Sequence, residues 1–179
     1  MPKHYIILDL ETTGLHPYHH GITEIAAVKF DGKTIIEEFH TLINPERHIS
    51  KGIERLTGIT NEMVIDAPKI NQVIPHFHDF LGEDYIVGHN VSFDFRFINH
   101  YHYQHFEQYL GNETICTMKL ARRYLPDLPN KKLCTVCDHF GVKNKQAHRA
   151  MNDTLATLNI FQHFLRMKDC DCLPSIKYV

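Results

Sequence analysis

The segment Tyr5-Ile-Ile-Leu-Asp-Leu10, close to the amino terminus, is apolar along almost its whole length. Such a run is typical of a strand that is buried at the centre of a sheet. Glu11 follows directly, so two acids, Asp9 and Glu11, stand two residues apart. Side chains at positions i and i+2 share one face of a strand. The sequence therefore predicts a central strand that presents two carboxylates on the same face.

Two carboxylates on a buried strand need a physical explanation, because they repel each other and lose their hydration. In one interpretation the strand ends at Glu11 and both acids reach water. In the other, a hard cation lies between Asp9 and Glu11. Mg²⁺ and Mn²⁺ prefer oxygen ligands of this kind. The pair alone leaves both interpretations open.

The rest of the chain alternates between strand and helix patterns. Further strands are expected at 23–30, 34–43, 85–88 and 114–116, with Asp31-Gly32 as a hairpin turn after the first of them. Helices are expected at 49–56 (ended by Gly58), 68–81, 92–105 (with Ser92 as N-cap), 118–124, 132–140 and 149–166. Because a meander of strands precedes the alternation, the sequence predicts an α/β fold with a mixed five-stranded sheet flanked by helices.

Three later residues are candidates for the same site. Asp94 lies in the first turn of an expected helix, where an acid also complements the helix dipole. Asp153 heads a mostly apolar stripe on the last helix, which favours an inward-pointing acid. His148 precedes Asp153 by five residues, which is about 140° around a helix. Both can serve one site only if His148 lies on the loop before that helix.

Composition narrows the class of protein. The 179 residues correspond to one domain at about 150 residues per domain, and the formal net charge of −2 excludes a histone-like polycation. Five scattered cysteines do not indicate a disulfide framework. No signal-peptide pattern or membrane-spanning run is found, so we expect a cytoplasmic protein without a membrane partner.

Three motifs together resemble those of a known family. Asp9-Leu-Glu-Thr-Thr-Gly-Leu15 resembles the first exonuclease motif of the DEDDh group, which includes the epsilon proofreading subunit of bacterial DNA polymerase III. His89-Asn-Val-Ser-Phe-Asp94 resembles the second motif, and His148-Arg-Ala-Met-Asn-Asp153 resembles the third. Leu56-Thr-Gly-Ile-Thr60 is similar to the family's intervening segment. The resemblance covers about residues 4–166 and implies a single exonuclease domain of RNase H-like fold, with a short tail at 167–179.

The resemblance also implies roles for individual residues. The four metal-binding acids would be Asp9, Glu11, Asp94 and Asp153, and the general base would be His148. The residues that meet the terminal nucleotide would be Thr12, Thr13, Gly14, Leu15, Asn90 and Phe93. For Phe93, packing in the core is an equally good explanation.

The implied activity is 3′→5′ exonuclease cleavage of single-stranded DNA, which releases nucleoside 5′-monophosphates. Two divalent cations, Mg²⁺ or Mn²⁺, about 4 Å apart can activate a water and stabilise the leaving 3′ oxygen. They also explain how an acidic protein handles a polyanion. A polymerase is a possible partner.

Three alternatives stay open at this point. The substrate could be RNA or short oligoribonucleotides, since the 2′-OH decides this locally. The chain could be a catalytically silent module that docks on a polymerase or on nucleic acid. It could also bind zinc through Cys134, Cys137, Cys170 and Cys172, although Cys137 lies on an apolar helical face that favours the core.

Overall fold

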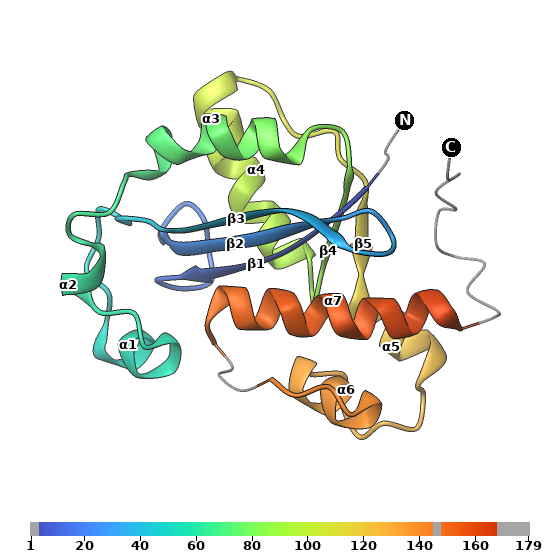
Figure 1. The fold of residues 1–179 in the computed structure, drawn as a ribbon. Helices are drawn as coiled ribbons and strands as arrows, with labels where there is room; N and C mark the ends of the chain where they lie inside the picture. Colours follow the sequence, from blue (N-terminus) through green and yellow to red (C-terminus); the bar gives the residue numbers. More distant parts are fainter. Residues whose placement is uncertain (1–3, 145–147, 168–179) are drawn as a thin grey trace.

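A computed structural model describes residues 4–144 and 148–167, which form a five-stranded sheet with the order β3-β2-β1-β4-β5 (Figure 1). The strands are β1 Tyr5–Thr12, β2 Ile22–Phe30, β3 Ile35–Leu42, β4 Tyr85–Gly88 and β5 Thr114–Cys116. β1 pairs with β2 in the antiparallel sense and with β4 in the parallel sense. The mixed five-stranded sheet expected from the sequence is therefore confirmed.

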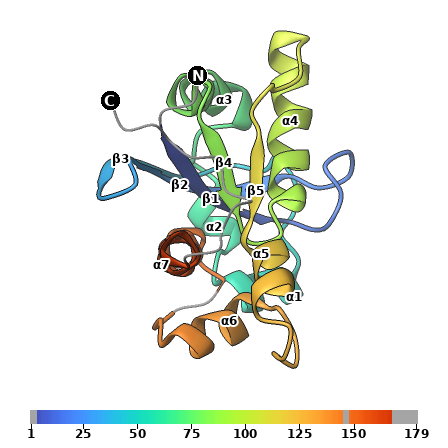
Figure 2. The same ribbon diagram turned by 90° about the vertical axis from the view of Figure 1, so that its right-hand side faces the viewer.

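Helices cover both faces of the sheet (Figures 1 and 2). The helices are α1 Lys51–Thr57, α2 Asn61–Val64, α3 Ile70–Leu81, α4 Ser92–Phe106, α5 Thr117–Tyr124, α6 Leu133–Phe140 and α7 Ala150–Arg166. α3 and α4 pack on one face, and α7, with α5 and α6 against it, packs on the other. Within the described residues, no helix is both long and apolar enough to span a lipid bilayer.

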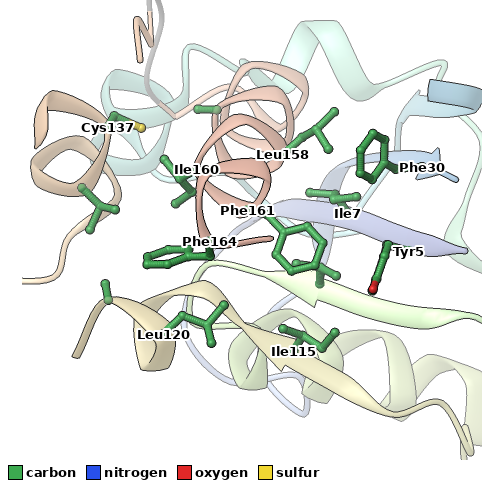
Figure 3. Packing of buried hydrophobic residues seen from close by; sticks show 14 of the residues in the cluster. Tyr5, Ile7, Phe30, Ile115, Leu120, Cys137, Leu158, Ile160, Phe161 and Phe164 are labelled. Carbon is green, nitrogen blue, oxygen red and sulfur yellow. The ribbon is translucent and has the colours of Figure 1, made fainter. Parts of the chain in front are cut away.

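The alternation of β1 divides the core between the two faces. Ile6 and Leu8 pack with α3 and α4, whereas Tyr5 and Ile7 pack with α7. Phe161 of α7 is fully buried, and its ring meets the edge of the Tyr5 ring with centroids 4.9 Å apart (Figure 3). Since odd-numbered residues of β1 face α7, the next two odd positions, Asp9 and Glu11, point toward the same helix.

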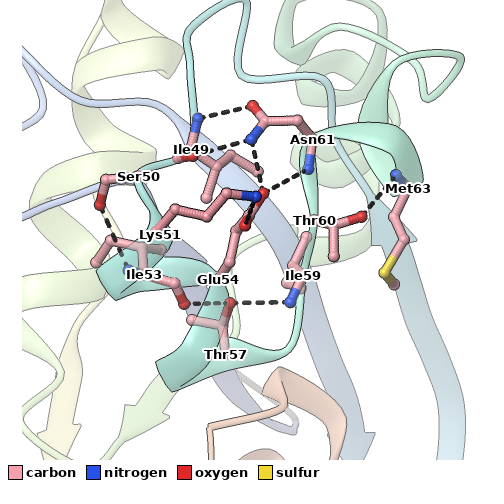
Figure 4. Close-up of polar contacts among 10 residues, drawn as sticks. All are labelled: Ile49, Ser50, Lys51, Ile53, Glu54, Thr57, Ile59, Thr60, Asn61 and Met63. Atoms are coloured by element: carbon pink, nitrogen blue, oxygen red, sulfur yellow. Dashed lines mark hydrogen bonds and ion pairs between the residues drawn. The ribbon is translucent and has the colours of Figure 1, made fainter.

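The segment around α1 and α2 is tied together by polar contacts (Figure 4). The side-chain amide of Asn61 donates to the Ile49 carbonyl at 2.9 Å and to Oε1 of Glu54 at 2.8 Å. Gly58 ends α1 in the left-handed conformation with φ 72°, as its position in the sequence predicts. The four-residue helix α2 was not expected, because one helical turn is too short to show a period.

Most expected boundaries differ from the structure by one or two residues, and three of these differences concern the acid pair and the starts of α4 and α3. β1 continues through Glu11 to Thr12, so the acid pair lies within the strand and not beyond its end. Ser92 is the first residue of α4 and not its N-cap; Val91 occupies that position with helical dihedrals and no side-chain cap. α3 begins at Ile70, two residues after Pro68, because Lys69 is still extended.

We predict that Phe161→Ala lowers the free energy of unfolding by about 3–5 kcal/mol, because it leaves a cavity between β1 and α7. Denaturant unfolding followed by circular dichroism measures the loss. Ile36→Thr is the control, since Ile36 is 50% exposed on the edge strand β3. A control loss as large as that of Phe161→Ala would contradict the assignment of the core.

Candidate active site

Asp9 and Glu11 lie near the carboxyl end of β1, beside the start of α7 (Figure 1). Glu11 is only 9% exposed, and Asp9 is half-buried. Both positions belong to the face that α7 covers. The strand therefore presents two carboxylates on one face, as the spacing in the sequence predicts, and the structure places this face under the start of α7.

Asp94 joins the pair from the first turn of α4. Its side chain is buried, and Oδ1 accepts a hydrogen bond from the Leu10 amide at 3.2 Å. This bond fixes Asp94 against the backbone between Asp9 and Glu11. The acid therefore lies beside the two acids of β1 as well as at the helix terminus.

Asp153 and His148 complete the group. Asp153 is buried in the first turn of α7, and its Oδ2 accepts a hydrogen bond from the His148 amide at 2.9 Å. Its Oδ1 accepts one from the side-chain amide of Asn144. His148 precedes α7, is exposed and has a left-handed backbone with φ 67°. Its predicted place on the loop before the helix is confirmed.

The carboxylates are crowded enough to shift one another's ionisation. Burial, then the charges of Asp94 and Asp153, raise the pKa of Asp9 well above its usual range. Burial and the charge of Asp153 raise the pKa of Glu11 to about 8. Burial raises the pKa of Asp94 to about 7. The site thus holds acids in an environment that opposes their ionisation until a cation neutralises them.

Ligand atoms of three residues lie close enough to hold a metal ion. One atom each from Glu11, His148 and Asp153 lies within 4.8 Å of the others, and no other such group occurs among residues 4–144 and 148–167. Buried carboxylate oxygens suit hard divalent cations. The donor set therefore fits Mg²⁺ or Mn²⁺.

Glu24 is a fifth acid of this region that the sequence analysis missed. It is fully buried on β2 as the strand partner of Glu11. Burial raises its pKa, but hydrogen bonds from Arg149, His40 and the Ala150 amide outweigh burial, so the pKa lies below its ordinary value. An acid inside the largely apolar strand Ile22–Phe30 is the same signal that Asp9 gives within β1.

The loop after β1 is held in place by its own polar contacts. The Thr12 hydroxyl donates to the Gly14 carbonyl at 2.7 Å, and the Thr13 hydroxyl accepts from the Gly21 amide at 3.0 Å. A Cβ on Gly14 would clash with the His20 ring, so a larger residue there requires His20 to move. Leu15 remains 77% exposed.

The two other residues expected at the terminal nucleotide lie near the start of α4. Asn90 is exposed in the left-handed conformation with φ 67°. Phe93 is half-buried, with its ring centroid 5.1 Å from that of Phe97 in the core. The side chain of Asn90 is therefore accessible to a ligand, whereas much of the Phe93 surface is buried by packing.

The described cysteines do not gather around a zinc position. Cys137 is 1% exposed in the core, and burial raises the pKa of its thiol to about 11, which disfavours the thiolate that zinc requires. Cys134 is exposed. Cys170 and Cys172 lie outside the described residues.

Comparison with known proteins gives the family. A family model described as "Exonuclease" matches residues 6–161. The chain is 38% identical over 157 residues to "DNA polymerase III subunit epsilon" of Aquifex aeolicus (strain VF5), covering 88% of this chain and 78% of that protein. It is 40% identical over 163 residues to "DNA polymerase III PolC-type" of Bacillus subtilis (strain 168), covering 90% of this chain but only 11% of that longer protein.

Solved structures of exonucleases are also similar to this chain. Exonuclease X in complex with 5′ overhanging duplex DNA is 34% identical, with a TM-score of 0.71 over 90% of this chain and 92% of that chain. E. coli exonuclease I in complex with a dT13 oligonucleotide shares the fold, with a TM-score of 0.81 at 21% identity over 92% of this chain and 41% of that chain. The sheet and the acidic site therefore define a nuclease of RNase H-like fold. The chain belongs to the exonuclease family, which confirms the family, the fold and the exonuclease class expected from its motifs.

We predict that the metal-free protein loses stability as the pH rises from about 7 to about 8.5. The pKa of Glu11 is about 8 in the folded chain but 4.5 ordinarily, so over this range the folded state holds a proton that the unfolded state has released. Stability then falls with rising pH. The range lies above the titration of His89 and His102, whose lowered pKa values act in the opposite direction at lower pH.

Melting temperatures in EDTA across this pH range measure the effect. Glu11→Gln should flatten the dependence, and millimolar Mg²⁺ or Mn²⁺ should raise the melting temperature by mass action. A melting temperature that rises with pH in EDTA, or that neither metal changes, would argue against this electrostatic description.

Proposed function

We propose that the protein is a metal-dependent 3′→5′ exonuclease, a single domain that releases nucleoside 5′-monophosphates from single-stranded DNA ends. The observation that carries the proposal is the meeting of Asp9, Glu11, Asp94, Asp153 and His148 at one end of β1. Its similarity to known proteins supports it, because they include a polymerase III subunit and an exonuclease in complex with DNA.

Four acids of the site hold two divalent cations in this proposal, either Mg²⁺ or Mn²⁺. The supporting observation is the raised pKa of Asp9, Glu11 and Asp94, which burial raises in all three and the neighbouring acids raise further in Asp9 and Glu11. A bound cation favours the charged form of each carboxylate and so offsets both effects. Four carboxylates carry four negative charges, which two divalent cations balance. When bound, the cations supply Lewis-acid stabilisation of the scissile phosphate and of the leaving 3′ oxygen.

His148 acts as the general base. An imidazole nitrogen takes a proton from the attacking water, whose oxygen bonds to phosphorus as the bond from phosphorus to the 3′ oxygen breaks. The leaving 3′ oxygen takes up a proton. The exposed position of His148 beside Glu11 and Asp153 supports this role.

The segment Thr12–Leu15, together with Asn90 and Phe93, meets the terminal nucleotide. The supporting features are the fixed turn at Thr12 and Thr13, which holds the backbone in one shape, and the exposed apolar side chain of Leu15. An apolar contact with a base accepts any sequence, as an exonuclease requires.

A polymerase is the proposed partner. Its support is the similarity to a polymerase III subunit and to part of the PolC-type polymerase. Copurification with a replicative polymerase tests this partnership separately from the chemistry.

We expect the protein to shorten a 5′-labelled single-stranded DNA into a ladder from its 3′ end in Mn²⁺ or Mg²⁺. EDTA should abolish the ladder because the acids alone cannot bind phosphate. An RNA strand of the same sequence gives the DNA/RNA rate ratio. Faster cleavage of the RNA would mean that RNA, and not DNA, is the substrate. No cleavage of either strand with metal bound would favour a silent docking module.

Asp9→Asn should abolish cleavage and raise the melting temperature of the metal-free protein, because it removes a ligand together with its repulsion. His148→Ala should lower kcat by on the order of 10²–10⁴, as loss of a general base does. Single-turnover rates on labelled DNA measure both. Asp79→Asn is the matched control, an exposed acid of α3 on the opposite face of the sheet, and it should retain the full rate.

A further inference from the structure

Glu24 differs from the four acids beside it, because both of its oxygens are already occupied by donors of the protein. Oε1 accepts from Nη2 of Arg149 at 3.1 Å and from Nε2 of His40 at 2.8 Å. Oε2 accepts from the Ala150 amide at 3.0 Å and from Nε of Arg149 at 3.5 Å. Glu24 is fully buried, so no further partner reaches it from solvent. Its carboxylate is therefore committed to these bonds and is not a metal ligand.

His40 donates to Glu24 from β3, whereas the other two donor residues of Glu24, Arg149 and Ala150, are neighbours in the chain. Arg149 and Ala150 directly follow His148, and Ala150 is the first residue of α7. The amides at the start of a helix lack partners within the helix. No side chain at the N-cap, Arg149, supplies such a bond. Glu24 therefore caps α7 from the neighbouring strand β2.

The backbone just before this cap is held in an unfavourable conformation. His148 has φ 67°, a region that residues other than glycine seldom adopt. Such conformations persist where the surrounding contacts fix them. The fixed contacts here are the bond from the His148 amide to Asp153 on one side and the Glu24 bonds to Arg149 and Ala150 on the other.

We propose that Glu24 is a positioning residue that, through Arg149 and the Ala150 amide, holds His148 at the site for proton transfer. The inference rests on the proposed function, because His148 is the general base there. Glu24 lies beside Glu11 in the sheet, so one pair of strands carries both a metal ligand and the anchor of the base. Arg149 balances the charge that Glu24 adds to an already acidic region.

Glu24→Gln tests the proposal. The glutamine has nearly the same shape, but its side-chain NH2 donates and cannot accept, so the two hydrogen bonds that one of the carboxylate oxygens accepts are lost. We expect kcat on single-stranded DNA to fall about 10- to 100-fold, as on loss of an outer partner of a catalytic group. KM should stay nearly unchanged, because the terminal nucleotide is bound elsewhere.

Thr154→Val is the matched structural control. The Thr154 hydroxyl donates to the Ala26 carbonyl at 3.1 Å, so it ties the same helix to the same strand without touching the His148 segment. We expect a lower melting temperature with an unchanged kcat. An equal loss of kcat in both variants would overturn the proposal, because Glu24 would then only stabilise the packing of α7.

Coupling to His148 separates positioning from other roles. In a His148→Ala background, Glu24→Gln should cause no further loss of kcat, since the residue it positions is gone. A double variant whose loss is the product of the two single losses would overturn the proposal. If Glu24→Gln does not fold, Arg149→Gln makes the same test, because it keeps the bond from Ala150 to Glu24.

A readout without turnover distinguishes failure of this proposal from failure of the proposed function. The ¹H–¹⁵N signals of the His148 imidazole should shift in Glu24→Gln and Arg149→Gln but not in Thr154→Val. If these signals respond while the unmodified protein cleaves no strand, only the proposed function fails. If they respond in neither variant, the positioning role of Glu24 is wrong whatever the activity.

Discussion

The site depends on the burial of several like charges at the end of one strand. Asp9 and Glu11 occupy odd positions of β1, so the alternation that sends Tyr5 and Ile7 into the core sends the acids under the start of α7. Their repulsion is an energetic cost that the remaining apolar contacts of the sheet must offset. The same repulsion makes the site ready for divalent cations, because neutralisation returns that free energy on binding.

Much of the fold follows from local patterns. The continuous apolar run of β1, the Asp31-Gly32 turn and the glycines that end α1, α3 and α6 each act over a few residues. These features can be predicted from the sequence because the residues that cause each one lie within the segment itself. The spacing of Asp9 and Glu11 and the position of His148 before α7 follow in the same way.

Features that depend on distant segments were not predictable. The left-handed backbone of His148 is fixed by contacts with Asp153 and, through its neighbours, with Glu24 on another strand. The start of α4 at Ser92 and the short helix α2 also depend on surrounding packing. Glu24 is a different case, since its acid within an apolar run was visible but its partners, 125 and 126 residues away, were not.

The register of β1 has an evolutionary consequence. β1 is paired residue by residue with β2 up to Glu11 and with β4 from Tyr5 to Ile7, and the regular pairing with β2 breaks only between Glu11 and Thr12. An insertion or deletion of one residue before that break would exchange the two acids with their leucine neighbours and turn the carboxylates toward α3 and α4. A one-residue change in length leaves the orientation of both acids intact only if it falls after Thr12. Homologues that differ in length near this strand should therefore carry the difference in the loop between Thr12 and Gly21. This loop can vary while both acids stay on the same face of the strand.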